Sequence, residues 1–68
     1  MAWYQLTLKN EFDREEVIPI EKDDDDMAYA RAKQIVYERN AGSVRLKSAM
    51  LFRLEHIWTA TFKTDPDF

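Results

Sequence analysis

The sequence predicts one small α+β domain of the order β-β-α-β-β, in which a single helix packs on one face of an antiparallel sheet. Three observations support this fold class. Apolar and polar residues alternate with a period of two near both ends of the chain, a central segment has helical spacing, and that segment carries cap residues at its ends. All 68 residues are assigned to this one domain, with 65–68 as a short tail.

The central helix is expected over Asp23–Asn40. Asp23 or Asp24 can cap the first backbone N–H groups, and the aspartates that follow lie at the positive end of the helix dipole. One face of the helix should point into a core, and its apolar residues are Ala28, Ala32, Ile35 and Val36. Gly42 follows the helical pattern and is expected to form a left-handed C-terminal cap.

The first hairpin is expected before this helix. Residues 2–9 alternate as a half-buried strand with Trp3 on the wetter side, and residues 10–15 are polar enough to form a loop. Val17–Ile20 is a short apolar run, which we interpret as the antiparallel partner strand. Pro19 has no N–H to donate, so this strand should lie at an edge of the sheet.

The segment after the helix fits two structures. Alternation over residues 44–54 and 58–63 predicts a second hairpin, which we prefer, although Glu55 and His56 are poor turn residues. Residues 49–58 also fit helical spacing, with Ser48 as a cap. The preferred fold predicts the following core: Tyr4, Leu6, Leu8, Ile18, Ile20, Ala28, Ala32, Ile35, Val36, Val44, Leu46, Met50, Phe52, Leu54, Trp58, Ala60 and Phe62.

Length and composition exclude several classes of protein. A chain this short buries only about 60% of its unfolded surface, so a deep catalytic pocket is not expected. Cysteine is absent, which excludes a disulfide framework and a cysteine-bound structural zinc site. The first residues do not resemble a signal peptide and no membrane-spanning apolar run is present, so we expect a cytoplasmic location and no membrane partner.

No catalytic or cofactor motif is present. His56 is the single histidine, and neither Ser43 nor Ser48 lies in a nucleophile elbow. The single glycine excludes a phosphate-binding loop, and the aspartates lack the spacing of a calcium loop. We therefore expect no enzyme activity, no cofactor and no metal.

Charge is unevenly distributed along the chain. The net charge is −3, but residues 11–26 hold nine acidic and two basic residues, whereas residues 27–63 hold seven basic and two acidic ones. Such an acidic surface could mimic nucleic-acid phosphates and attract a basic groove. The first candidate partner-binding surface is therefore the acidic patch, formed by Glu15, Glu16, Glu21, Asp23, Asp24, Asp25 and Asp26.

Two further surfaces are candidates. The sheet face opposite the helix is expected to carry cations around an aromatic ring, which could stack bases and neutralise phosphates. The residues predicted for binding on this face are Trp3, Arg45, Lys47, Arg53 and Lys63, with Leu51 beside them. On the helix, Tyr29, Lys33 and Tyr37 form a stripe for a partner, unless Tyr29 packs at the margin of the core.

The layout resembles the small phage-encoded anti-CRISPR proteins, several of which are chains of this size with one helix on an antiparallel sheet. The resemblance rests on a strand-loop-strand unit (Trp3–Ile20), an acid-started helix (Asp23–Asn40) and a final hairpin (Gly42–Lys63). It implies a compact non-enzymatic binder that occupies a nucleic-acid or partner site on a bacterial defence complex, such as a CRISPR effector complex, in the host cytoplasm. Members share no sequence, so no functional residue is carried over.

The sequence thus supports a protein-binding inhibitor or adaptor as the first hypothesis. The alternative is a small nucleic-acid-binding protein that uses the basic and aromatic sheet face. A third hypothesis is a homo-oligomer formed through the edge at Pro19 or through the open sheet face.

Overall fold

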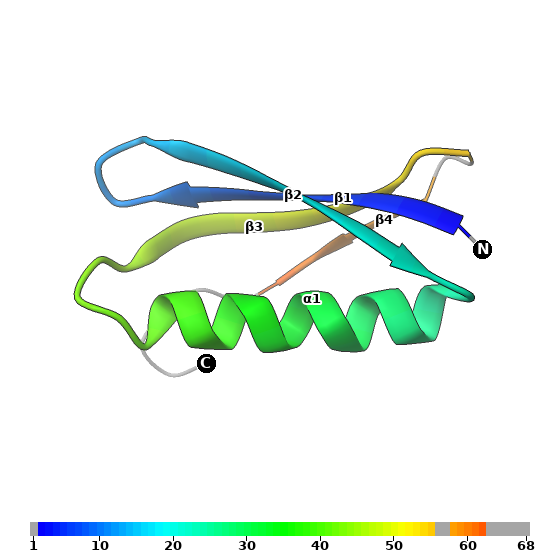
Figure 1. Ribbon diagram of the computed structural model, residues 1–68. Helices are drawn as coiled ribbons and strands as arrows, with labels where there is room; N and C mark the ends of the chain where they lie inside the picture. Colours follow the sequence, from blue (N-terminus) through cyan, green and yellow to red (C-terminus); the bar gives the residue numbers. More distant parts are fainter. Residues whose placement is uncertain (1, 56–57, 63–68) are drawn as a thin grey trace.

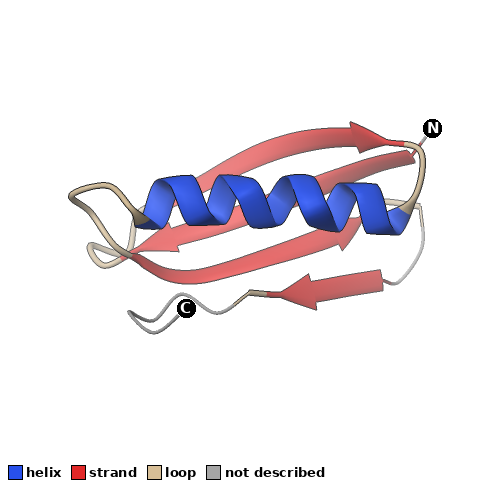
Figure 2. Ribbon diagram, turned by 90° about the horizontal axis from the view of Figure 1, so that it is seen from below, coloured by secondary structure: helices blue, strands red, loops and turns tan. Residues whose placement is uncertain are grey.

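The computed structural model describes residues 2–55 and 58–62, and it has the predicted β-β-α-β-β order. The elements are β1 (Ala2–Asn10), β2 (Glu15–Lys22), α1 (Asp25–Asn40), β3 (Leu46–Arg53) and β4 (Trp58–Thr61). The strands form one sheet in the order β2-β1-β3-β4, and all neighbours are antiparallel. The sheet is a single layer with α1 against one face (Figures 1 and 2).

The second hairpin is confirmed, and the helical alternative for residues 49–58 is wrong. β3 pairs with β1 on one side and with β4 on the other. A helix in this segment would leave the backbone N–H and C=O groups along that edge of β1 without hydrogen-bond partners. The prediction that Pro19 lies on an edge strand is also confirmed, because β2 is the first strand of the sheet. His56, Lys63 and the tail at 65–68 lie outside the described residues.

The helix begins as the aspartate run predicts. The Asp24 side chain accepts a hydrogen bond from the Met27 N–H at 2.8 Å, and Asp25 and Asp26 occupy the first turn. An acceptor at this position satisfies one of the N–H groups that a helix leaves without a backbone partner.

α1 lacks the length and the apolar character of a membrane-spanning helix, and no other helix occurs in the part of the chain that the structure describes.

The end of the helix differs from the prediction for Gly42. The cap residue is Ala41, in right-handed conformation, and Gly42 does not have a positive φ. The Gly42 N–H instead donates to the Arg39 carbonyl, and a Cβ at position 42 would lie 3.3 Å from that same oxygen. The glycine therefore allows a close backbone approach, and the expected left-handed cap is wrong.

The core lies between α1 and the sheet. Most of the predicted core is buried, including Tyr4, Leu6 and Leu8 on β1 and the four residues expected on the helix. Ile18, Trp58 and Ala60 are partly buried against this cluster. Val44 was also predicted inside, but it is half-buried, in the loop before β3.

In β3, the predicted alternation is wrong for its second half. Ala49 and Leu51 are buried at 3% and 0% exposure, whereas Met50 and Leu54 are exposed and Phe52 is half-buried. The cause is a β-bulge: Lys9 lies opposite Ser48 but Asn10 lies opposite Leu46, so β3 has one extra residue there. An extra residue reverses which side chains point toward the helix.

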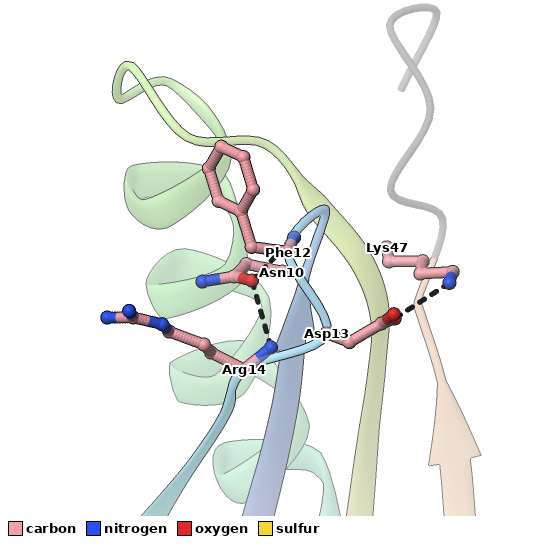
Figure 3. A network of polar contacts seen from close by, with 5 residues as sticks. All are labelled: Asn10, Phe12, Asp13, Arg14 and Lys47. Atoms are coloured by element: carbon pink, nitrogen blue, oxygen red, sulfur yellow. Dashed lines mark hydrogen bonds and ion pairs between the residues drawn. The ribbon is translucent and has the colours of Figure 1, made fainter.

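The loop between β1 and β2 has its own hydrogen bonds (Figure 3). The Asn10 side chain accepts from the Phe12 N–H at 2.8 Å and from the Arg14 N–H at 3.1 Å, as asparagine often does in turns. Asp13 has a φ of 63°, a conformation that asparagine and aspartate tolerate better than most residues. The Lys47 ammonium donates to Asp13 at 2.8 Å and so joins this loop to β3.

Candidate functional site

The strand register determines which residues lie on the sheet face that α1 does not cover. Directly opposed residues of antiparallel strands point to the same face. Trp3 on β1 therefore defines this surface, which we call the uncovered face, together with its register partners and alternate neighbours. They are Trp3, Gln5, Thr7 and Lys9 on β1, Glu15, Val17, Pro19 and Glu21 on β2, Ser48, Met50 and Phe52 on β3, and Thr59 and Thr61 on β4.

The centre of the uncovered face carries no charge and has apolar side chains on both sides of Gln5 and Thr7. Thr7 lies between Val17 and Met50, and the next row places Pro19 and Phe52 on either side of Gln5. Val17 is 55% exposed, Met50 36% and Trp3 48%. Charged residues of the described strands occur only in the first and last rows of this face, which makes its centre suitable for contact with another apolar surface.

Two residues predicted for this face, Arg53 and Leu51, lie on the other side of the sheet. The bulge turns Arg53 and Leu51 toward the helix, so their predicted position on the open face is wrong. Arg45 precedes β3 and is exposed, and Lys47 binds Asp13 at the hairpin loop. Trp3 is on the face as predicted, and Lys63 lies outside the described residues.

Arg53 belongs to a polar cluster at the N-terminal end of α1. Asp25 accepts hydrogen bonds from the Tyr4 hydroxyl at 2.5 Å and from Arg53 Nη1 at 2.9 Å. The guanidinium carbon of Arg53 lies 5.8 Å from the centre of the Tyr4 ring, and Trp58 meets the same ring edge to face at 6.0 Å. Asp25 therefore joins the helix to β1 and β3, a structural role within the aspartate run.

This environment changes the acidity of Tyr4. Burial, together with the hydrogen bond to Asp25, raises the pKa of the Tyr4 hydroxyl from 10.0 to about 12. The hydroxyl is protonated at neutral pH and already donates to Asp25. The arrangement therefore holds the N-terminal end of the helix against β1.

The acidic patch is divided by β2. Glu15 and Glu16 lie at its first end, whereas Glu21 and the aspartates of the 23–26 run lie at and beyond its other end. Glu21 lies six positions after Glu15 along the strand, a distance of about 20 Å. The structure therefore separates the acidic patch into two groups, one at each end of β2.

Several of these acids are paired within the molecule. Glu16 accepts two hydrogen bonds from the Arg39 guanidinium, at 3.1 and 3.0 Å, and Asp25 binds Arg53. Asp13, in the loop between β1 and β2, binds Lys47. The Lys47 ammonium lowers the pKa of Asp13, mainly through its hydrogen bond. The charge separation along the sequence thus partly serves folding, because cations of the second half bind acids of the first.

The predicted helix stripe is divided between two environments. Tyr29 is 38% exposed and its ring stacks on Phe62, with centroids 4.9 Å apart, as in the alternative that places it at the core margin. Lys33 is exposed, and Tyr37 is 64% exposed. Tyr37 is therefore the aromatic residue of the stripe with most of its surface in water.

A hollow of about 310 Å³ opens at the hairpin end of the molecule, between β1, β2 and the segment after α1. Leu8, Val44 and Leu46 supply its apolar wall, and the Glu16–Arg39 pair and Arg14 supply polar groups. Glu16 and Arg39 neutralise each other within this hollow. Among the described residues, no group of three side chains could hold a metal ion.

Sequence reasoning missed the four apolar residues that lie beside Thr7 and Gln5 on the uncovered face: Val17, Pro19, Met50 and Phe52. Strict alternation assigns Met50 and Phe52 to the core, and it predicts Val17 and Pro19 only as part of an edge strand. One signal was present, since the same alternation placed the polar Ser48 among core positions. A polar residue at such a position is consistent with a change of register before it.

Comparisons with protein-family models, with curated proteins and with solved structures found no match.

Proposed function

We propose that this chain is a non-enzymatic protein-binding module that presents the uncovered face of its sheet to a partner protein. The observation that carries the proposal is the register, which places Trp3, Val17, Pro19, Met50 and Phe52 on one face away from the helix. Exposed aromatic and apolar residues grouped in this way are typical of interaction surfaces.

The dimensions of the molecule fit an interface of modest size. Its extents are 34 × 19 × 15 Å, so the broad face offers on the order of 600 Å² to a flat partner, somewhat below the ~800 Å² per side of a standard complex. This area supports a specific complex only if a few residues contribute most of the affinity, and tryptophan is the residue type most often found in that role.

The resemblance to anti-CRISPR proteins makes a bacterial CRISPR effector complex the first candidate partner. In that setting, the module would act as an inhibitor by occupying a surface that the complex uses for nucleic acid or for another subunit. Nucleic-acid binding by the sheet receives less support, because Arg53 is turned toward the helix and bound by Asp25, and Lys47 is bound by Asp13.

Affinity capture with matched variants tests this function. Phe52→Ser and Met50→Ser change the centre of the uncovered face, and Tyr37→Ser changes a more exposed aromatic on the helix. The wild-type chain and Tyr37→Ser should capture the same effector complex or the same lysate protein at moderate salt, whereas the two face variants should lose it. Capture that survives both face variants, or loss with Tyr37→Ser alone, would move the interface off the sheet.

A further inference from the structure

We propose that the Trp3 end of the uncovered face binds an arginine side chain of the partner protein. This inference rests on the proposed function, because it names the chemistry of one contact within that interface. It concerns three side chains at one corner of the sheet, which we call the Trp3 corner: Trp3, Glu21 and Leu54.

Backbone pairing brings these residues together. Trp3 and Glu21 are register partners of β1 and β2, so their side chains lie next to each other on the same face. The Leu54 N–H donates to the Trp3 carbonyl at 3.1 Å and places this residue on the other side of Trp3. Trp3 is 48% exposed, Leu54 is 62% exposed, and Glu21 is also exposed.

The charge of Glu21 is not compensated within the described structure. Asp13, Glu16 and Asp25 each bind a cation of the chain, but no described lysine or arginine contacts Glu21 or lies over the Trp3 ring. At the opposite end of the face, Lys9 and Glu15 are register partners, so their charges offset each other. Among the described residues of the uncovered face, the Trp3 corner therefore carries a negative charge with no cation paired to it.

An arginine satisfies both groups of this corner at once. The flat guanidinium can lie over the indole ring, whose face attracts cations, while its N–H groups donate to the Glu21 carboxylate beside it. Its aliphatic stem can cover Leu54. An anionic side chain would be repelled by Glu21, and a neutral one would leave the carboxylate desolvated without a partner.

Binding of short peptides to the intact chain tests this inference directly. The probe is a capped pentapeptide of the order threonine, valine, arginine, valine, threonine, and its control replaces arginine by the neutral isostere citrulline. Nuclear magnetic resonance titration should show shifts at the Trp3 indole N–H, with binding about tenfold tighter for the arginine peptide.

Two carboxylate variants provide the matched comparison. Glu21→Gln should reduce the preference for arginine to about twofold, whereas Glu16→Gln should leave it unchanged, because Glu16 lies on the helix side and binds Arg39. Equal binding of both peptides, an unchanged preference in Glu21→Gln, or no shift at Trp3 at millimolar peptide would each overturn the proposal. So would self-association that Lys9→Gln abolishes, since a second copy would then supply the cation.

The two proposals fail in different ways. If the captured partner is lost with Phe52→Ser but is held as tightly by Glu21→Gln as by wild type, the sheet face remains the interface and the arginine contact is refuted. If capture is unaffected by Phe52→Ser, the proposed function fails, whatever the peptides show.

Discussion

Alanine substitution of two adjacent β3 residues tests the reversed alternation that creates the uncovered face. Leu51 is fully buried between sheet and helix, whereas Met50 is 36% exposed on the opposite face. Truncating a fully buried leucine costs about 3 kcal/mol because it removes apolar contacts and leaves a cavity. Met50→Ala should cost less than about 1 kcal/mol, because water already reaches its side chain and no second layer packs on it.

Urea unfolding followed by far-ultraviolet circular dichroism measures both costs. In a domain of this size, the Leu51→Ala loss corresponds to a fall in melting temperature on the order of 10–20 °C, or to complete unfolding. Leu51→Met is the control, since a substitution that conserves volume should cost less than about 1.5 kcal/mol. If Met50→Ala destabilises the protein more than Leu51→Ala does, the bulge does not reverse the alternation in β3 and the uncovered face is wrongly assigned.

Three further predictions concern the polar contacts. Asp24→Ala should lower the free energy of unfolding by about 1 kcal/mol, because the Met27 N–H loses its acceptor; an unchanged urea midpoint would contradict the cap. The raised pKa of Tyr4 implies stabilisation that is fully present below pH 10.0 and is lost as the pH rises through about 12. Tyr4→Phe should therefore remove a late step from the tyrosine absorbance titration. Persistence of that step in the variant would refute the assignment to Tyr4. Glu16→Gln should change the free energy of unfolding by less than about 1 kcal/mol, since both side chains of the Glu16–Arg39 pair are 49% exposed. A larger decrease, measured by urea unfolding, would contradict this prediction.

Local patterns in the sequence were sufficient for the element order. The helix could be predicted because its N-terminal cap and its apolar face are both encoded in neighbouring residues of the chain. The first hairpin followed from the alternation over β1, and the edge position of β2 followed from Pro19, whose missing N–H excludes it from a central strand. Each of these signals depends only on neighbours in the chain.

The site was harder to predict because it depends on register between distant segments. The bulge opposite Asn10 is a property of the pairing between β1 and β3, and it decides whether Met50 and Phe52 or Ala49 and Leu51 meet the helix. Arg53 was misplaced for the same reason, since it turns with Leu51. Composition revealed the charge imbalance along the chain but not the ion pairs that reduce it.

The most direct test of the proposed interface is photo-crosslinking from two positions of the same chain. A photoreactive benzoylphenylalanine is placed at Phe52 in one protein and at Tyr37 in another, and each is irradiated in a bacterial lysate or with a purified CRISPR effector complex. The proposed function predicts a single adduct of defined mass from position 52 and none from position 37, together with weaker crosslinking when Trp3→Ala is added. An adduct from position 37 alone, or no adduct from position 52, would contradict the assignment of the uncovered face as the binding surface.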